Sequence, residues 1–471
     1  MKRIISVILA FLLVFLLSGC TSSTPEPQII VDTIVNNTPD TEVTPEPDNK
    51  NETPDNSQPS SPPAEVPKNE ESQQPTTDNS GEQRDENTSV KNENPKIENT
   101  QQEIVSEHTA LKKEDLYQYS FLNNSEKRLY DTFYSTALAG INNIDIEAMG
   151  LNKNVVLKVY SAFLADNPQF FYIAKHYSYT ISQRRDIVLE FTLYYSDGIT
   201  EDAFDDEGNP TTAADRNIIK SQINEFSKDI TDFLATVPSN VRDVEKEKKI
   251  YDFILENVKY DSQLADQVKD GEVDAITHSF SAYGAMCKGV AVCEGYAKLF
   301  QYLCYQVGIN ATQVHGVSGT NHMWNAVLID GKWYMADPTW DDSDKPELHY
   351  HKYFNITTAQ LTEDHTIDSD KLEVPACDST EAAFYKVFAL VPSNNEMPSN
   401  YKEIIDLAIK NNEKYICIYR GNSSANLEDF INTKIYSRSS PFRAYVNEKG
   451  YNVTLGSTYL ITSKYYYIQI A

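Results

Sequence analysis

Three residues in the second half of the chain are of the types that nucleophilic catalysis requires: Cys293, His322 and Asp337. A thiolate can attack a carbonyl carbon, and an imidazole can transfer the proton. A carboxylate can orient the imidazole and stabilise its protonated form. These side chains can act together only if the elements that carry them bring them into contact.

A helix over residues 291–308 is expected to carry Cys293 in its first turn. Small or apolar residues recur on one face of this helix, at Cys293, Ala297, Phe300 and Cys304. The amides and the macrodipole at a helix N-terminus favour a thiolate and can bind an oxyanion. A cysteine on a buried face is more often a small core residue, and that interpretation suits Cys304.

A hairpin is expected to position the other two residues. Asp330-Gly331 separates two runs of alternating apolar residues, which is a strong signal for a two-residue turn. With that turn His322 lies opposite Thr339, and Asp337 is its diagonal neighbour on the same face. The alternative is a hairpin with an unrelated surface histidine and aspartate. Because the shared face is largely apolar, a histidine and a carboxylate on it are expected to be paired.

The residues around these positions match a family pattern. The strings VCEGYAKLFQYLCYQVGI, VHGVSGTNHMWNAVLIDGKWYMADPTWDD and YFNIT resemble the transglutaminase-like superfamily, over about 120 of the 471 residues. The resemblance implies an α+β fold: a papain-like core whose Cys-bearing helix packs on an antiparallel sheet, flanked by small α+β segments. It also implies that Cys293 is the nucleophile, His322 the general base and Asp337 the orienting acid.

Two residues upstream of the helix have candidate roles. The resemblance implies an oxyanion helper before the nucleophile, and Tyr283 in the string SAYGAMC is the candidate. Cys287 in the same string is an alternative nucleophile or a disulfide partner. It lies before the helix and lacks the GYA context of Cys293, so a structural or free thiol is expected. Apart from Cys20 the chain has five cysteines, so at least one is free, and no disulfide framework is indicated.

No metal or cofactor is expected. Possible ligand types follow the hairpin, at Asp341, Asp342, Asp344, His349 and His351. Their spacing fits neither an EF-hand loop nor a zinc site. Most of these acids are therefore expected to be solvated turn residues.

The first twenty residues predict export and a lipid anchor. Lys2 and Arg3 precede an apolar run, Ile4–Leu17, that is short for a membrane span. The run ends in Leu-Ser-Gly-Cys, which resembles a bacterial lipobox, in which the signal is cleaved before Cys20 and the thiol is diacylated. An ordinary secretory signal is the alternative. We expect a bacterial protein tethered to the cell membrane through Cys20, on its extracellular or periplasmic face.

Residues 21–108 are expected to be a disordered tether. They hold 19 acidic and 5 basic residues, 12 of the 21 prolines and no aromatic residue. Such a segment cannot bury enough apolar surface to offset its ordering entropy. The net charge of the whole chain is −28, which repels phosphate and excludes nucleic acid as a partner.

The rest of the chain is expected to form an N-terminal α+β region over 109–240, the catalytic domain over 241–372 and a C-terminal α+β domain over 377–471. In the first region, periodicity predicts helices from Ser125, over 155–165 and over 212–234, and a hairpin of 176–181 with 187–195. In the last, it predicts helices over 401–410 and 427–433 and strands over 386–391, 414–419, 442–446, 451–455, 458–462 and 465–470.

These features favour a surface-anchored thiol peptidase or amidase that acts on peptide or protein amide bonds, with cell-wall peptide as a candidate substrate. The acyl-enzyme would form on Cys293. The resemblance does not choose between hydrolysis and transfer, because the superfamily contains both peptidases and transglutaminases. A protein-glutamine transamidase is therefore an alternative. A surface-binding or adhesion module with a relict triad is a third interpretation, and the intact triad argues against it.

Overall fold

The computed structural model describes residues 29–34, 112–140, 143–182, 184–195, 213–269, 278–342, 351–421, 426–462 and 465–471. The predicted signal peptide with Cys20, and all of the predicted tether except residues 29–34, lie outside these ranges. Within them, no helix combines the length and the hydropathy that crossing a bilayer requires.

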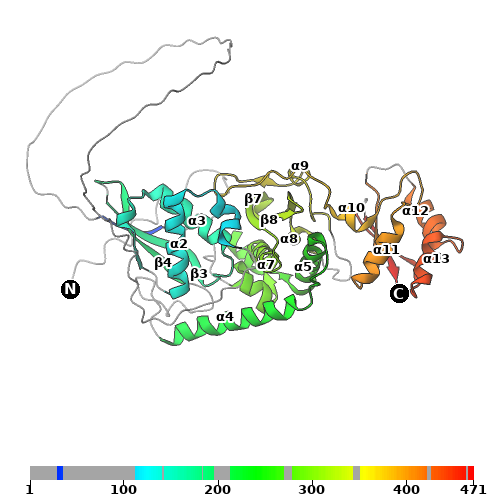
Figure 1. Cartoon of the computed structure of the whole chain (residues 1–471), viewed down its shortest axis with the longest axis horizontal. Helices are drawn as coiled ribbons and strands as arrows, with labels where there is room; N and C mark the ends of the chain where they lie inside the picture. Colours follow the sequence, from blue (N-terminus) through cyan, green and yellow to red (C-terminus); the bar gives the residue numbers. More distant parts are fainter. Residues whose placement is uncertain are drawn as a thin grey trace, which may run out of the picture. The chain divides into compact units, whose positions relative to one another are not determined.

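The N-terminal region is a four-stranded sheet with two helices packed on it (Figure 1). Phe133 of α2 and Tyr160 of α3 both contact Phe191 of β4, with ring centroids 5.1 Å apart in each pair. The predicted hairpin of β3 with β4 is confirmed, as are the predicted helices. The bounds are α1 (Tyr117–Ser120), α2 (Asn124–Ala139), β2 (Asn143–Asp145), α3 (Lys153–Asp166), β3 (Ile173–Ser182), β4 (Ile187–Tyr195) and α4 (Ala213–Leu234).

Strand β1 (Ile29–Ile34) corrects the prediction that residues 21–108 contain no regular element. It pairs in parallel with β3, with Ile34 opposite Ile181. Five of its six residues are β-branched, and such residues favour strands even within a segment that is otherwise rich in proline and acid.

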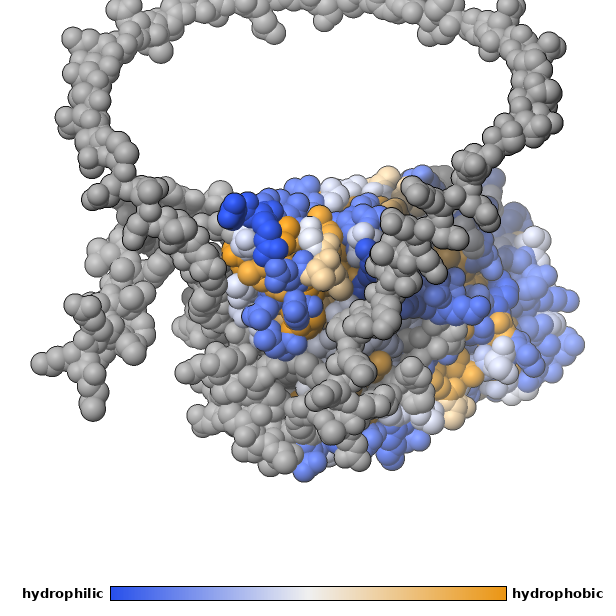
Figure 2. Space-filling view, turned by 60° about the vertical axis from the view of Figure 1, so that its left-hand side comes forward, coloured by the Kyte–Doolittle hydropathy of each residue, from blue (hydrophilic) through white to orange (hydrophobic). Residues whose placement is uncertain are grey.

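The face shown in Figure 2 carries hydrophilic residues interspersed with small hydrophobic patches where it is not covered by grey atoms. Among the described residues, large hydrophobic side chains with substantial exposure include Tyr260 and Trp340, which are 42% and 43% exposed. Single exposed aromatic residues are ordinary on protein surfaces. These two residues matter for the site because Tyr260 interacts with Cys293 and the ring of Trp340 lies near that of His322.

The catalytic region is a helix packed on an antiparallel sheet, as expected. Helix α7 (Cys293–Gln306) lies against the sheet of order β10-β7-β8-β9 (Figure 1). The Asn325 side chain of β8 donates a hydrogen bond to the Ala297 carbonyl of α7 at 3.1 Å. The bounds are α5 (Asp243–Asn257), β5 (Lys259–Tyr260), α6 (Ser262–Lys269), β6 (Val290–Ala291), β7 (Ala311–Ser318), β8 (Thr320–Ile329), β9 (Lys332–Ala336), α8 (Pro338–Asp341), α9 (Thr358–Leu361) and β10 (Thr366–Ile367).

The hairpin of β8 with β9 has the predicted turn and register, with Ile329 opposite Lys332. Asp330 and Gly331 both have positive φ, 49° and 75°, as a type I′ turn requires. The ladder ends where Asn325 pairs with Ala336. The expectation that His322 faces Thr339 is therefore wrong, because the chain leaves the sheet at Asp337 and enters α8.

The two faces of β8 have different neighbours. Val327 and Ile329 belong to the large core that includes α7. Trp324, which is fully buried, packs on the opposite face with Met335 and Tyr353. His322 has the parity of Trp324, and their rings stack with centroids 5.6 Å apart. The histidine therefore lies on the apolar face, as its position in the sequence predicts.

The C-terminal domain is a sheet of order β11-β12-β14-β13 with helices beside it. The predicted helix over 401–410 is confirmed, the predicted helix over 427–433 continues beyond α12 as a π-helix to Tyr436, and the two strands predicted over 451–462 form one strand. The bounds are α10 (Phe384–Val387), β11 (Ala389–Leu390), α11 (Tyr401–Lys410), β12 (Tyr415–Tyr419), α12 (Leu427–Phe430), α13 (Pro441–Glu448), β13 (Val453–Thr462) and β14 (Tyr465–Ile470).

Two strand predictions in this domain are wrong. Residues 442–446 lie in helix α13, and residues 386–391 contain the end of α10 and only the two-residue strand β11. Ser440 caps α13 by accepting the Arg443 amide at 3.1 Å, and Pro441 occupies the first helical turn. Phe442 and Val446, four residues apart, are both fully buried on one face.

Gly295 allows the first turn of α7 to pack closely on the chain before it. A Cβ at this position would lie 2.6 Å from the Ser279 carbonyl oxygen and 2.7 Å from the Ala291 Cβ. Neither the backbone carbonyl nor the Cβ can move without displacing its segment. The position of Cys293 thus depends on a glycine two residues later.

We expect Gly295→Ala to destabilise the protein by about 1–3 kcal/mol, because overpacking forces backbone shifts. The measurement is the free energy of unfolding in urea. Gly308→Ala is the matched control at the other end of α7, because it has a φ of 82° and nothing within 4 Å of an added Cβ. The free energy of unfolding of the control should fall by only about 1 kcal/mol, which is the cost of holding a non-glycine residue in the left-handed conformation. Equal losses in the two variants would contradict the packing explanation.

Candidate active site

Cys293 is the first residue of α7, as the sequence predicts, and its side chain is partly exposed. The N-cap residue Val292 makes no side-chain hydrogen bond to the first turn of α7, and the helix N-terminus, which favours negative charge, begins at the thiol-bearing residue itself. The Val292 amide itself is bound to the Ser279 carbonyl at 2.9 Å, which fixes the entry of the chain into the helix.

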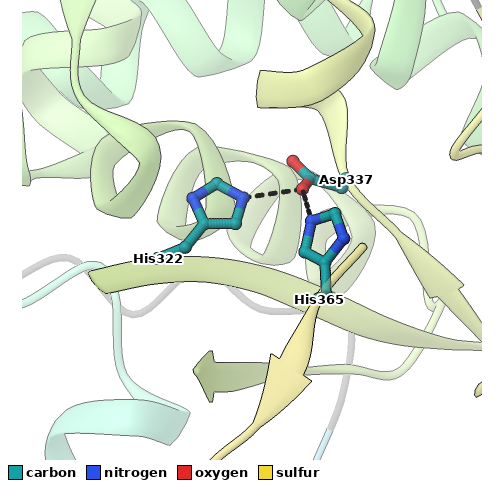
Figure 3. A group of neighbouring side chains, drawn as sticks. All are labelled: His322, Asp337 and His365. Atoms are coloured by element: carbon teal, nitrogen blue, oxygen red, sulfur yellow. Dashed lines mark hydrogen bonds and ion pairs between the residues drawn. The ribbon is translucent and has the colours of Figure 1, made fainter. Parts of the chain in front are cut away.

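His322 and Asp337 form a buried pair. The Nε2 atom of His322 lies 2.7 Å from Oδ2 of Asp337, and the two side chains are 6% and 0% exposed (Figure 3). Asp337 is also the N-cap of α8, where its Oδ1 accepts the amides of Thr339 at 3.0 Å and Trp340 at 3.2 Å. The carboxylate is therefore held in place from both of its oxygens.

The thiol of Cys293 also acts on the His322 imidazole and contributes to raising its pKa. Since Nε2 is engaged with Asp337, the Nδ1 atom is the one left for the thiol. Burial lowers the pKa of His322, but the charge of Asp337, the hydrogen bond to it and the interaction with Cys293 outweigh burial and raise this pKa to about 10. The imidazole is thus stabilised as a cation beside the thiol.

The carboxylate shows the complementary shift. Burial raises the pKa of Asp337, but the charges and hydrogen bonds of His322 and His365 outweigh it and lower this pKa to about 2. Asp337 is therefore a carboxylate at any physiological pH. It can orient the base without exchanging a proton with it.

Comparisons with known proteins identify the domain that carries these residues. Residues 232–338 match the family model of the transglutaminase-like superfamily. This chain carries a transglutaminase-like domain.

Two curated relatives share this part of the chain. Kyphoscoliosis peptidase of Mus musculus is 27% identical over 177 residues, which are 33% of this chain and 25% of the relative. The protein of the same name from Homo sapiens is 27% identical over 147 residues, 27% of this chain and 21% of the relative. The chain thus spans a quarter or less of the length of these relatives.

A solved structure described as that of a TGase matches this chain at 14% identity and a TM-score of 0.24. The matched part is 38% of this chain and 54% of the solved chain. At that TM-score the likeness supports no conclusion. The domain assignment rests on the family match and the curated relatives.

The transglutaminase-like domain brings a residue to the site that the sequence did not reveal. His365 precedes β10, and its Nε2 lies 3.2 Å from Oδ2 of Asp337, the same oxygen that His322 binds (Figure 3). The sequence offered one signal for it. His365 follows the YFNIT string and directly precedes Thr366-Ile367, a pair of β-branched residues that could have indicated a short strand. Nothing in its spacing from Asp337 indicates contact, because this contact depends on where an edge strand joins the sheet.

The ligand atoms of His322, Asp337 and His365 lie within 4.8 Å of one another, and zinc accepts nitrogen and oxygen donors of these types. A cation bound there would replace both hydrogen bonds to Asp337 and occupy the predicted base. The hydrogen-bonded arrangement is the one that suits proton transfer at the thiol.

Tyr283, the candidate oxyanion helper, has its hydroxyl engaged elsewhere. It donates to Oε2 of Glu225 at 2.6 Å, and its ring stacks on Phe171 with centroids 4.8 Å apart. These contacts of Tyr283 do not support its predicted role as an oxyanion helper. The pKa of Tyr260 is raised to about 12, first by burial and then by the charges of Cys293 and three acids. The parallel pairing of β5 with β6 puts Tyr260 opposite Ala291.

The other cysteines are free and differ from Cys293 in surroundings. Cys304 is fully buried, as expected, and burial raises its pKa well above the ordinary value. Burial and the nearby Asp229 likewise raise the pKa of Cys287, and burial raises that of Cys377 to about 12 and that of Cys417 still further.

The acids after the hairpin are not simply solvated. Asp341 is buried and accepts the Tyr353 amide at 2.8 Å and the Tyr251 hydroxyl at 2.7 Å, and Asp342 accepts the Tyr296 hydroxyl. The expectation of solvated turn residues is wrong for Asp341, because α8 turns it inward. His351 is bound to Asp252 at 2.7 Å. Asp344 and His349 lie outside the described residues.

We expect iodoacetamide at about pH 6 to label Cys293 before the other four described cysteines. Only the thiolate reacts quickly, and the imidazolium of His322 stabilises it at this position alone. Peptide mapping after brief labelling gives the order of reaction. The preference should weaken in His322→Ala. Faster labelling of Cys287, or labelling of Cys293 that ignores the His322 change, would show that the ion pair is absent.

We also expect a pH-dependent contribution of the His322–Asp337 pair to stability. The folded-state pKa of His322, about 10, exceeds its ordinary value of 6.5, so the contribution is complete below about pH 6.5 and is lost as the pH rises through about 10. Because the pKa of Asp337 is lowered to about 2, the contribution of the pair to stability is lost on the acid side only as the pH falls towards 2. The Tm difference between the parent and Asp337→Asn should therefore shrink from about pH 6.5 to about pH 10.5. A difference that stays constant over this range would contradict the assignment.

Proposed function

We propose that this protein is a thiol-dependent enzyme that cleaves peptide or protein amide bonds through an acyl-enzyme on Cys293. The observation that carries the proposal is the contact of one imidazole with both partners. His322 binds the buried carboxylate of Asp337 at 2.7 Å through Nε2, and the Cys293 thiol at the start of α7 contributes to the raised pKa of the same imidazole. These contacts support the assignment of Cys293 as nucleophile, His322 as base and Asp337 as orienting acid.

The residues present account for both halves of the reaction. The Cys293 thiolate attacks the amide carbonyl carbon, and the first-turn amides of α7 bind the oxyanion. The C–N bond breaks as the His322 imidazolium protonates the leaving amine, and a thioester remains. Water then attacks the thioester while His322 takes its proton, and the acid is released with the thiolate restored.

Transfer to an amine is the second candidate. The same thioester would be attacked by a substrate amine instead of water, which gives a new amide and the same free thiolate. The exposed rings of Trp340 and Tyr260 favour this alternative, because an apolar border disfavours water at the thioester. The ring of Trp340 lies 6.4 Å from that of His322. The name of the curated relatives, a peptidase, favours hydrolysis, which we rank first.

The setting of this activity is part of the proposal. The Leu-Ser-Gly-Cys string that ends at Cys20 supports a lipid anchor on the extracytoplasmic face of a bacterial membrane. Peptides of the cell wall would then be within reach of a catalytic domain at the end of an acidic tether. A binding module with a relict triad is disfavoured, because the triad side chains retain their catalytic contacts.

The purified ectodomain, incubated with a glutamine-bearing protein and a fluorescent primary amine, tests the proposal. Amide loss without incorporation of the amine supports hydrolysis, and incorporation supports transfer. If neither reaction occurs with any substrate in a panel of peptides and proteins, the result would favour the binding module.

Substitutions at the three triad positions should lower turnover to different extents, because each residue has a different role. Cys293→Ala should reduce turnover to background, and His322→Ala nearly so. Asp337→Ala should cost less, because Asp337 does not touch the substrate. Cys287→Ala is the matched thiol control and should retain activity. Full activity in Cys293→Ala would end the assignment.

A further inference from the structure

The imidazole of His365 is enclosed and lies between two carboxylates. Its side chain has no exposed surface. The Nε2 atom lies 3.2 Å from Oδ2 of Asp337, and Nδ1 lies 2.6 Å from Oδ1 of Asp364. An ionised carboxylate only accepts hydrogen bonds, so the ring faces an acceptor at each of its nitrogens. The geometry therefore holds His365 between two carboxylates.

Asp364 is held as an acceptor for that ring. Its Oδ2 accepts the Tyr353 hydroxyl at 2.7 Å and the Lys352 ammonium at 3.1 Å. Burial raises the pKa of Asp364, but its hydrogen bonds to Tyr353, His365 and Lys352 outweigh burial and lower this pKa. The charged groups facing His365 are thus two carboxylates, with the His322 and Lys352 cations each one contact away.

The fold fixes the ring in this position. Strand β10 joins the edge of β7, with Ile367 opposite Gly316, and the residue before β10 is His365. A Cβ at Gly316 would lie 2.0 Å from the Thr366 carbonyl oxygen and 2.6 Å from Trp324, so the strand can come this close only beside a glycine. Aromatic rings surround the imidazole, with centroids 5.0–5.4 Å away at Trp340, Trp324 and Tyr353.

We propose that His365 is a positioning residue that completes the triad: it donates a charge-assisted hydrogen bond to Asp337 and so keeps that carboxylate oriented towards His322. The inference rests on the proposed function, since it assigns His365 a part in activating Cys293. His365 does not touch the reacting atoms. It acts through Asp337, whose Oδ2 it shares with His322, and removal of its hydrogen bond would leave that oxygen with the His322 contact as its one described partner, which weakens the orientation of the carboxylate.

Two substitutions test the hydrogen bond to Asp337. His365→Phe keeps an aromatic ring and removes the hydrogen bond, whereas His365→Gln keeps an N–H donor for Asp337 without the imidazole. The first readout is the rate at which iodoacetamide alkylates Cys293, measured from about pH 5 to about pH 9. His365→Phe should lower the rate at about pH 6 on the order of tenfold and flatten the pH profile, and His365→Gln should recover part of the loss. In turnover assays kcat should fall while KM stays nearly unchanged.

His351→Phe is the matched control. His351 is a buried histidine outside this cluster; its Nε2 binds a carboxylate, Asp252, at 2.7 Å, and its ring stacks on Phe384. The same replacement there should lower Tm and leave the alkylation rate of Cys293 unchanged. A purely structural role of His365 would produce the same pattern in His365→Phe and would overturn the proposal.

If His365→Phe does not fold, the decision passes to His365→Gln and Asp364→Asn. The latter removes the negative charge that faces Nδ1 and should reduce Cys293 reactivity in the same direction but by less. Unchanged reactivity in both would reject the role. Because alkylation needs no substrate, the outcome is independent of the proposed amide chemistry. A protein without turnover whose thiol still responds to His365 would reject the function and keep the positioning.

Discussion

The site depends on one buried charge, the carboxylate of Asp337. A carboxylate without contact to water is stable only when donors replace its lost hydration. Four donors do so: the rings of His322 and His365 and the amides of Thr339 and Trp340. These come from strand β8, the residue before β10 and the start of α8. Satisfying a single carboxylate thus requires three separate parts of the fold to be in their final positions.

The thiol is positioned by a different kind of constraint, which is close packing. Gly295 lets the first turn of α7 approach Ser279, and Asn325 of β8 binds the Ala297 carbonyl of the same helix. Further along, the Gln301 side chain donates to the Ala165 carbonyl at the end of α3. The N-terminal region therefore supports the helix that carries Cys293, although it has no catalytic residue that we recognise in the sequence.

Charge and packing meet at His322. Its imidazole receives its orientation from the buried carboxylate and presents its other nitrogen to a thiol that packing has placed. This division explains why glycine occupies two close approaches beside the site, Gly295 and Gly316. At each of them a side chain would push away the element that carries a functional residue. Close backbone approach is a use of glycine that no other residue can replace.

The sequence by itself determined what is local. Apolar periodicity placed α7 and its first-turn cysteine, and Asp330-Gly331 fixed the turn and register that put His322 on the apolar face near Asp337. Only the tertiary structure decided how the hairpin ends and what else reaches the carboxylate. The ladder stops at Ala336 because Asp337 caps a helix, and His365 arrives because an edge strand pairs with β7 beside a glycine. Such contacts join residues distant in the chain, and periodicity carries no information about which distant segments meet.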